Sequence, residues 1–145
     1  MRRKITAVVL SALTLVLAPL ATNASASTKS DVVSLAKSVC GSGYTVTVDA
    51  GDMGIPKQYY WSVLLYNPSS GYNCAVNVKD SNNTDYGKAS GIGMGIRVAG
   101  GSWNEDKGSY TKYAGPVYVH APSTCVYLRL TSPELTWTSN AMGCS

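Results

Sequence analysis

The chain has 145 residues, with 12 basic and 8 acidic side chains and a formal net charge of +4. Three of the basic residues, Arg2, Arg3 and Lys4, lie at the amino terminus. Without them nine basic residues remain against eight acidic ones. The charge therefore gives no reason to expect nucleic acid or a membrane surface as a partner.

The first 26 residues have the pattern of a secretory signal peptide. The basic start is followed by an apolar run from Ile5 to Leu20 and by Ala24-Ser25-Ala26, a small-residue cleavage site. The apolar run is shorter than the roughly 20 residues that a membrane-spanning helix needs. We therefore expect residues 1–26 to be removed and residues 27–145 to form a single exported domain with no membrane segment.

The sequence contains four cysteines, Cys40, Cys74, Cys125 and Cys144. An even number in a small exported domain predicts two disulfides. There is no C-x-x-C pair and only one histidine, so we expect neither a metal nor a cofactor. Of the three pairings, the sequence favours Cys40–Cys74 and Cys125–Cys144. Cys74 shares a strand face with Val76 and Val78, near where Cys40 is expected to enter the sheet from the helix, and a C-terminal tail crossing outside the sheet could reach Cys125.

One segment has helical periodicity. Apolar residues between positions 29 and 39 recur at helical spacing, Ser30 can cap the start, and Asp31 suits the first turn. Glycines follow Cys40, which is typical of a helix C-terminus. We expect a helix over about residues 29–39.

Beyond that helix the apolar pattern changes to a period of two, which predicts strands. The stretch from Gly100 to Tyr113 is polar and is interpreted as a loop. About seven short strands after one helix predict an all-β fold, a small disulfide-stapled sandwich or barrel. The alternative is an α+β domain with the helix packed on one face of a sheet. The expected strands cover 44–49, 59–66, 72–80, 91–98, 117–120 and 126–130, with a short one around 135–137.

Three alternate glycines in the fourth strand, Gly91, Gly93 and Gly95, leave one strand face bare. Glycines inside a strand usually mark the close approach of another group. An aromatic ring from a neighbouring strand is the favoured interpretation, and a ligand slot is the alternative.

The loop from Trp103 to Tyr113 is the predicted ligand face, if the protein has one. It combines aromatic rings with charged groups, and loops held by a rigid sheet are where binding residues concentrate. The structural alternative is that Trp103 packs over the glycines as part of the core. The candidate residues are Trp103, Glu105, Asp106, Tyr110 and Tyr113, with Lys107 and Lys112 beside them.

No motif predicts an enzyme. His120 has no recognisable nucleophile motif near it. A glycosidase needs two carboxylates that face each other across the substrate, which the adjacent Glu105 and Asp106 do not provide; Glu134 or Asp85 would have to supply the second carboxylate. The run 80–85 begins like a calcium loop but lacks its later glycine and acid. We expect no catalytic residue.

Three stretches carry a family resemblance: Cys-Gly-Ser-Gly-Tyr at 40–44, Leu-Tyr-Asn-Pro-Ser-Ser-Gly-Tyr-Asn-Cys-Ala-Val-Asn-Val-Lys-Asp at 65–80, and Tyr-Ala-Gly-Pro-Val-Tyr-Val-His-Ala-Pro-Ser-Thr-Cys-Val at 113–126. They resemble the spore-associated protein A family, small exported proteins of filamentous sporulating bacteria. The resemblance implies a location at the spore or cell surface and supplies no catalytic residues.

Three functions remain open at this point. The first is a secreted, non-enzymatic protein of the spore or cell surface. The second is a module that binds cell-wall polysaccharide through its tryptophan and tyrosine rings. The third is a secreted protease inhibitor, for which the segment 121–125 beside a cysteine would be the binding loop. The sequence does not indicate an oligomeric state.

Overall fold

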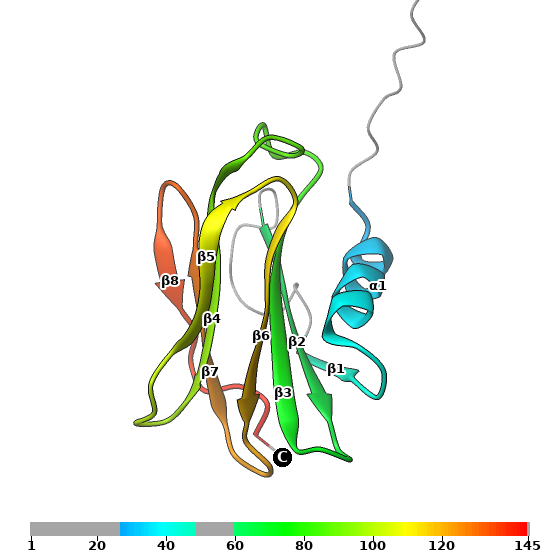
Figure 1. Ribbon diagram of the computed structural model, residues 1–145, viewed down its shortest axis with the longest axis vertical. Helices are drawn as coiled ribbons and strands as arrows, with labels where there is room; N and C mark the ends of the chain where they lie inside the picture. Colours follow the sequence, from blue (N-terminus) through cyan, green and yellow to red (C-terminus); the bar gives the residue numbers. More distant parts are fainter. Residues whose placement is uncertain (1–26, 49–59, 145) are drawn as a thin grey trace, which may run out of the picture.

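In the computed structural model, which describes residues 27–48 and 60–144, two four-stranded antiparallel sheets pack face to face behind one helix (Figure 1). The predicted all-β fold is confirmed and is a sandwich, with eight strands in the described residues where about seven were expected. The expected signal segment 1–26 lies outside the described residues. The elements are α1 (Lys29–Cys40), β1 (Thr45–Val48), β2 (Tyr60–Asn67), β3 (Tyr72–Lys79), β4 (Ser90–Val98), β5 (Asn104–Tyr110), β6 (Tyr113–His120), β7 (Val126–Thr131) and β8 (Thr136–Thr138).

The strand order is β1-β2-β3-β6 in one sheet and β5-β4-β7-β8 in the other. The β2–β3 hairpin predicted from the sequence is present, with Tyr60 opposite Lys79 and Asn67 opposite Tyr72. The Asn67 side chain accepts hydrogen bonds from the backbone N–H groups of Ser69 and Ser70, which holds the turn.

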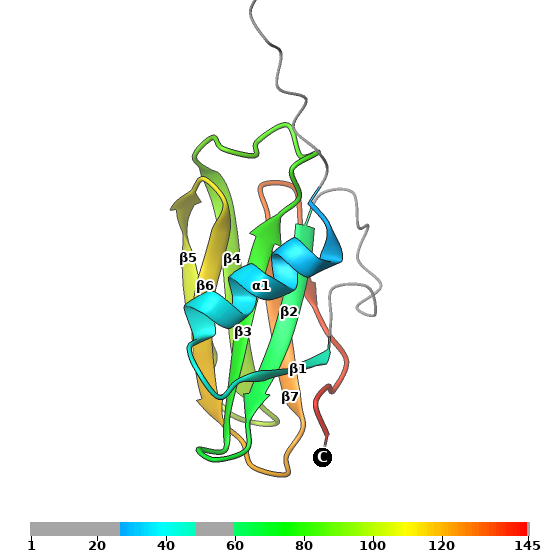
Figure 2. The ribbon, with the colours of Figure 1, turned by 90° about the vertical axis from the view of Figure 1, so that its right-hand side faces the viewer.

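Two apolar layers stabilise the fold. One lies between the sheets and includes Leu64, Ile92, Met94 and Leu128. The other lies between α1 and the first sheet, since α1 packs on β2, β3 and β6 (Figure 2). Strand β3 is consequently buried on both faces from Asn73 to Lys79. Burial of these side chains is the main favourable contribution to folding.

The N-cap of the helix lies two residues before the predicted one. Thr28 is the N-cap, its hydroxyl accepts a hydrogen bond from Asp31 N–H, and the Asp31 carboxylate accepts one from Thr28 N–H. The prediction of Ser30 as the cap was wrong because Ser30 is already inside the first turn. The reciprocal pair is a capping box.

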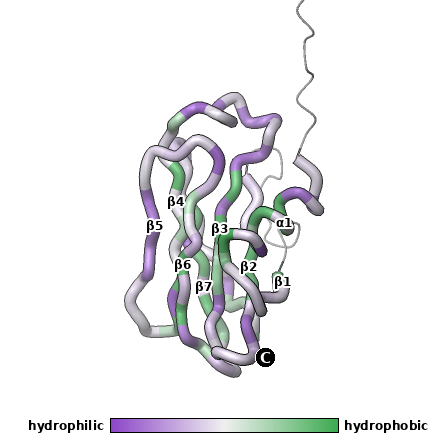
Figure 3. The backbone as a smooth tube through the Cα atoms, turned by 45° about the vertical axis from the view of Figure 1, so that its right-hand side comes forward, coloured by the Kyte–Doolittle hydropathy of each residue, from purple (hydrophilic) through white to green (hydrophobic). Residues whose placement is uncertain are grey.

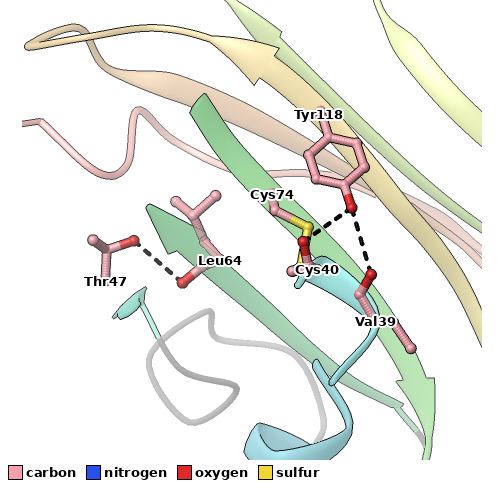
Figure 4. Close-up of a disulfide and its surroundings, with 6 residues drawn as sticks. All are labelled: Val39, Cys40, Thr47, Leu64, Cys74 and Tyr118. Atoms are coloured by element: carbon pink, nitrogen blue, oxygen red, sulfur yellow. Dashed lines mark hydrogen bonds between the residues drawn. A yellow bond between two sulfur atoms is a disulfide. The ribbon is translucent and has the colours of Figure 1, made fainter. Parts of the chain in front are cut away.

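The disulfides join Cys40 to Cys74 and Cys125 to Cys144, the pairing that the sequence favoured. Figure 4 shows the first bridge, which ties the end of α1 to β3. The Tyr118 hydroxyl donates to the carbonyl oxygens of Val39 and Cys40, at 3.4 and 3.2 Å. Tyr118 thus satisfies carbonyl groups that the helix end leaves without an intrahelical partner.

The interpretation of residues 100–113 as a loop was wrong, because Asn104–Tyr110 form the edge strand β5, paired with β4. This strand is mostly hydrophilic (Figure 3). Its inward-facing positions carry Asp106, Gly108 and Tyr110, of which only Tyr110 packs against the apolar core. The period-two signal that marks the other strands is therefore missing.

Candidate functional site

The predicted ligand face is divided between different surfaces of the sandwich. Trp103 and Glu105 lie over the outer face of the sheet β5-β4-β7-β8, close to Gly95. Asp106 and Tyr110 are bonded to each other, and Asp106 also reaches β6. Tyr113 packs with the apolar layer beneath α1. The structure therefore does not bring all five predicted residues together, but Asp106, Tyr110 and Tyr113 line one hollow with Lys112.

Asp106 connects the edges of the two sheets. Its carboxylate accepts a hydrogen bond from the Tyr110 hydroxyl at 2.5 Å and one from Gly115 N–H at 2.7 Å. The hydrogen bond to Asp106 is the main reason that the pKa of Tyr110 is raised above its ordinary value of 10.0. These contacts give Asp106 a structural function in closing the sandwich, although a hollow of about 460 Å³ lies beside it.

Trp103 lies against two arginine side chains on the outer sheet face. The guanidinium carbon of Arg129 is 4.1 Å from the centroid of the indole ring, and that of Arg97 is 4.6 Å from it. Arg97 also lies 5.7 Å from the ring centroid of Tyr127. A cation is attracted electrostatically to the aromatic face beneath it, by about 0.5–1 kcal/mol at exposed sites. The ring therefore holds both guanidinium groups in place.

The glycines explain how these side chains reach one another across β4. A Cβ atom on Gly95 would lie 3.0 Å from Glu105 Cγ and 3.3 Å from Trp103 Cε3, and one on Gly93 would lie 2.6 Å from Lys107 Cγ. The aromatic cover expected over the glycines is therefore present at Gly95, with Glu105 beside it. At Gly93 the cover is a lysine stem, and at Gly91 no heavy atom lies within 4 Å of such a Cβ.

Glu105 joins two of the basic residues. Its Oε1 atom lies 3.0 Å from the Arg129 guanidinium and 3.1 Å from the Lys107 ammonium. Desolvation raises the pKa of Glu105, but the hydrogen bonds and charges of Lys107 and Arg129 outweigh it and hold the pKa below 4.5. Glu105 is thus an ionised bridge between β5 and β7 near neutral pH.

We name the outer face formed by these side chains the basic face, consisting of Arg97, Trp103, Glu105, Lys107, Tyr127 and Arg129. No described element covers it, because α1 lies on the opposite side of the sandwich (Figure 1). Sequence reasoning missed Arg97, Tyr127 and Arg129. Their alternation with the apolar residues of β4 and β7 was a usable signal, because a period of two places them opposite the core.

Beside the basic face a shallow trough of about 370 Å³ runs over the uncovered end of β4. Its lining is largely apolar and includes Gly91, Lys107 and Pro133, whereas the Thr131 hydroxyl is buried and the Ser132 hydroxyl is bonded to the backbone of Leu135. Of the three glycines, only Gly91 is left uncovered, so the alternative prediction of a ligand slot over the glycines applies only here.

Sequence reasoning also missed Lys79, which is completely buried. Its ammonium donates to the carbonyl oxygens of Asp85, Lys88 and Tyr110 and to the Ser90 hydroxyl, at 2.7–3.2 Å. Burial lowers the pKa of Lys79 from 10.5, against the opposing charge of Asp85. The sequence gives no sign of this burial, because a lysine is normally expected at the surface and is fully buried only where partners surround it.

The remaining candidates from the sequence have structural contacts. The His120 ring lies tilted against the Tyr72 ring, with ring centroids 5.0 Å apart. Asp80 accepts hydrogen bonds from the Trp61 indole N–H and from Asn82 N–H. Within residues 27–48 and 60–144 no three acidic, histidine or cysteine side chains group in a way that could hold a metal ion. In the same residues no helix has the length and apolar character to cross a membrane.

Fold and site together define a small disulfide-bridged β-sandwich with one face covered by a helix and the other face basic and aromatic. Over 88 residues the chain is 36% identical to Spore-associated protein A of Streptomyces coelicolor, a match that covers 61% of this chain and 53% of that protein. The chain thus spans about half the length of this curated relative, and the match supports a relationship to the spore-associated protein A family. No family model and no solved structure matches the chain.

Proposed function

We propose that this chain is a secreted, non-enzymatic protein of the spore or cell surface, attached there through its basic face. The single observation that carries the attachment is the set of charged and aromatic side chains fixed on a sheet face that no described element covers. The name of the relative supports the association with spores. Two disulfides support export, because such bonds persist in oxidising compartments.

The engagement of the acidic groups supports a non-enzymatic role. Glu105 is held by two cations, and Asp106 is held by Tyr110 and a backbone N–H. General acid–base catalysis needs a group that can exchange a proton with the substrate. These two carboxylates are instead used to connect strands.

The protease-inhibitor alternative receives less support from the geometry of the segment 121–125. Ala121 is buried, and Ser123 has a φ of 51°. This is the left-handed region, whereas a segment that pairs with another chain as a strand is extended. The segment is a compact turn between β6 and β7.

Fractionation of a sporulating culture tests the proposed function. We expect intact-mass and N-terminal analysis to find a chain that begins at Ser27, with both disulfides formed, in the fluid and on washed spores. Recovery of the uncleaved, reduced chain from the cytoplasm would contradict the proposal.

A further inference from the structure

We infer that the basic face binds an anionic polysaccharide, a sugar polymer that carries carboxylate or phosphate groups. This inference rests on the proposed function, because it names the class of ligand that would hold the protein at the surface. It is carried by the charge, the fixed geometry and the open shape of the face.

The basic face has more positive than negative charge. Lys107 and Arg129 share the single carboxylate of Glu105. Among the described residues Arg97 forms no ion pair and lies instead against the rings of Trp103 and Tyr127. Two positive charges therefore remain without a neutralising partner. They are concentrated on one face of a domain whose predicted mature form is nearly neutral, which favours an anionic ligand.

The positions of the two guanidinium groups are fixed relative to each other. Both carbon atoms lie within 4.6 Å of the centroid of the same indole ring, so they are within about 9 Å of one another. Guanidinium groups bind carboxylate and phosphate oxygens through paired N–H donors. Trp103 acts as a positioning residue that presents two such groups to successive anionic units of a polymer.

The trough extends the surface along β4. Gly91 presents no side chain there, and Gly108, Pro133 and the Lys107 side chain contribute to a largely apolar lining. Apolar surface of this kind suits the C–H faces of sugar rings, while the neighbouring cations suit the anionic groups. An open surface of this kind gains affinity from several modest contacts along a polymer rather than from enclosing a small molecule.

Two other macromolecular partners fit this face less well. A protein partner usually covers a desolvated apolar centre, but the exposed large apolar residues of the described chain, Tyr72 and Leu135, lie outside the basic face. Single-stranded nucleic acid uses aromatic rings that are free to stack on bases. The ring of Trp103 is already occupied by two guanidinium groups.

The inference is tested by titration calorimetry of the purified, disulfide-bonded protein. The probes are oligogalacturonate, which carries carboxylates, a glycerol-phosphate oligomer, and an uncharged oligoglucan of similar length. We expect binding of at least one anionic probe, weakening as salt rises to about 0.5 M because the contacts are partly exposed. We expect no binding of the uncharged oligoglucan.

The variants Arg97→Gln and Lys107→Gln separate the face from the rest of the molecule. Each should weaken binding of the anionic probe by about tenfold, the loss of one charge-assisted contact. Lys37→Gln on the exposed face of α1 removes the same charge from the opposite side and should leave binding unchanged. Thermal unfolding of each variant shows whether the sandwich is intact. Lys107 is more exposed than Arg97, so Lys107→Gln tests the face even if Arg97→Gln disturbs the fold.

Three results would overturn the inference. They are equal binding of charged and uncharged probes, equal loss of binding in the Lys37 variant, and binding of single-stranded DNA as tight as that of the anionic glycan. Retention of the protein on spores without binding of either anionic probe would overturn the inference and leave the proposed function standing. If the protein binds an anionic probe in solution but is absent from spores, the binding inference stands and the proposed function is contradicted.

Discussion

Single side chains decide whether the basic face forms. Gly95→Val would place new methyl groups against Glu105 and Trp103, which already lie 3.0–3.3 Å from a Cβ at this position. We expect a loss of about 1–3 kcal/mol in the free energy of unfolding, because overpacking forces neighbours off their preferred conformations. Denaturant unfolding monitored by tryptophan fluorescence measures both the loss and the displacement of Trp103.

Gly91→Val is the matched control for that substitution. No heavy atom lies within 4 Å of a Cβ built at this glycine. The same change should therefore alter stability by no more than about 0.5 kcal/mol. Equal destabilisation by the two variants would show that strand glycine itself, and not the space for Trp103 and Glu105, is required.

The ionisation of Glu105 predicts a pH dependence. Its pKa is lower in the folded protein than the ordinary 4.5 because of Lys107 and Arg129, which outweigh desolvation. A lowered carboxylate pKa stabilises the fold above the unfolded pKa, and this contribution is lost as the pH falls through the folded pKa. Glu105→Gln should thus be less stable than the unaltered protein at pH 7, by less than about 1 kcal/mol.

Unfolding at about pH 7 and at about pH 3 measures this difference, which should shrink on acidification as Glu105 becomes protonated. Glu134→Gln, in the exposed turn before β8, is the control. A stability difference between Glu105→Gln and the unaltered protein that is equally large at both pH values would contradict an ionic contribution.

At the scale of the elements, the Cys40–Cys74 bridge holds α1 on the first sheet. It closes a loop with a sequence separation of 34 residues, and both cysteines are buried. Replacing both by alanine should cost about 2–4 kcal/mol. Hydrogen exchange should increase most in α1. The comparison is the variant in which Cys125 and Cys144, 19 residues apart, are both replaced by alanine, and its exchange in α1 should not increase. Unchanged exchange in α1 of the Cys40/Cys74 double variant would show that packing alone holds the helix.

Lys79 holds the loop between β3 and β4 against the end of β5. Lys79→Met would remove the ammonium donor from three carbonyl groups and from the Ser90 hydroxyl, although the Asp85 carbonyl would keep its hydrogen bond from Lys88 N–H. Because unsatisfied buried acceptors cost about 1–3 kcal/mol each where water cannot reach them, we expect a loss of roughly 3 kcal/mol. Limited proteolysis should then cut within residues 80–88. Lys88→Met, at an exposed side chain, should not do this, and equal cleavage of both would contradict the assigned contacts.

The elements with a regular apolar period could be predicted from the sequence. The helix, the β2–β3 hairpin and the strands β4 and β7 follow from periods of 3.6 and two. Strand β5 could not, since its inward Asp106 bonds to another strand's backbone instead of entering an apolar layer. The basic face was found only in part, because Trp103 and Glu105 are joined to Arg97 and Arg129 by strand pairing across the sheet, which local patterns do not specify.

For the whole molecule, α1 and the sheet β5-β4-β7-β8, which carries the basic face, lie on opposite sides of the sandwich (Figure 1). The helix covers one sheet and leaves the other sheet available. In the proposed function the side with Trp103 serves attachment, while the side with the Cys40–Cys74 bridge has no part in it. Variants on the two sides should thus have separable effects on unfolding and on retention at the surface.

The most direct test measures the fraction of purified protein retained by washed spores that lack the endogenous protein. The double variant Arg97→Gln/Lys107→Gln is compared with Lys37→Gln on α1 and with the unaltered chain, each first shown to unfold at a similar temperature. We predict that the double variant is released from the spores at a salt concentration at least about tenfold lower than the one that releases the unaltered chain, and that Lys37→Gln is retained as well as the unaltered chain. Equal retention of all three proteins would contradict attachment through the basic face.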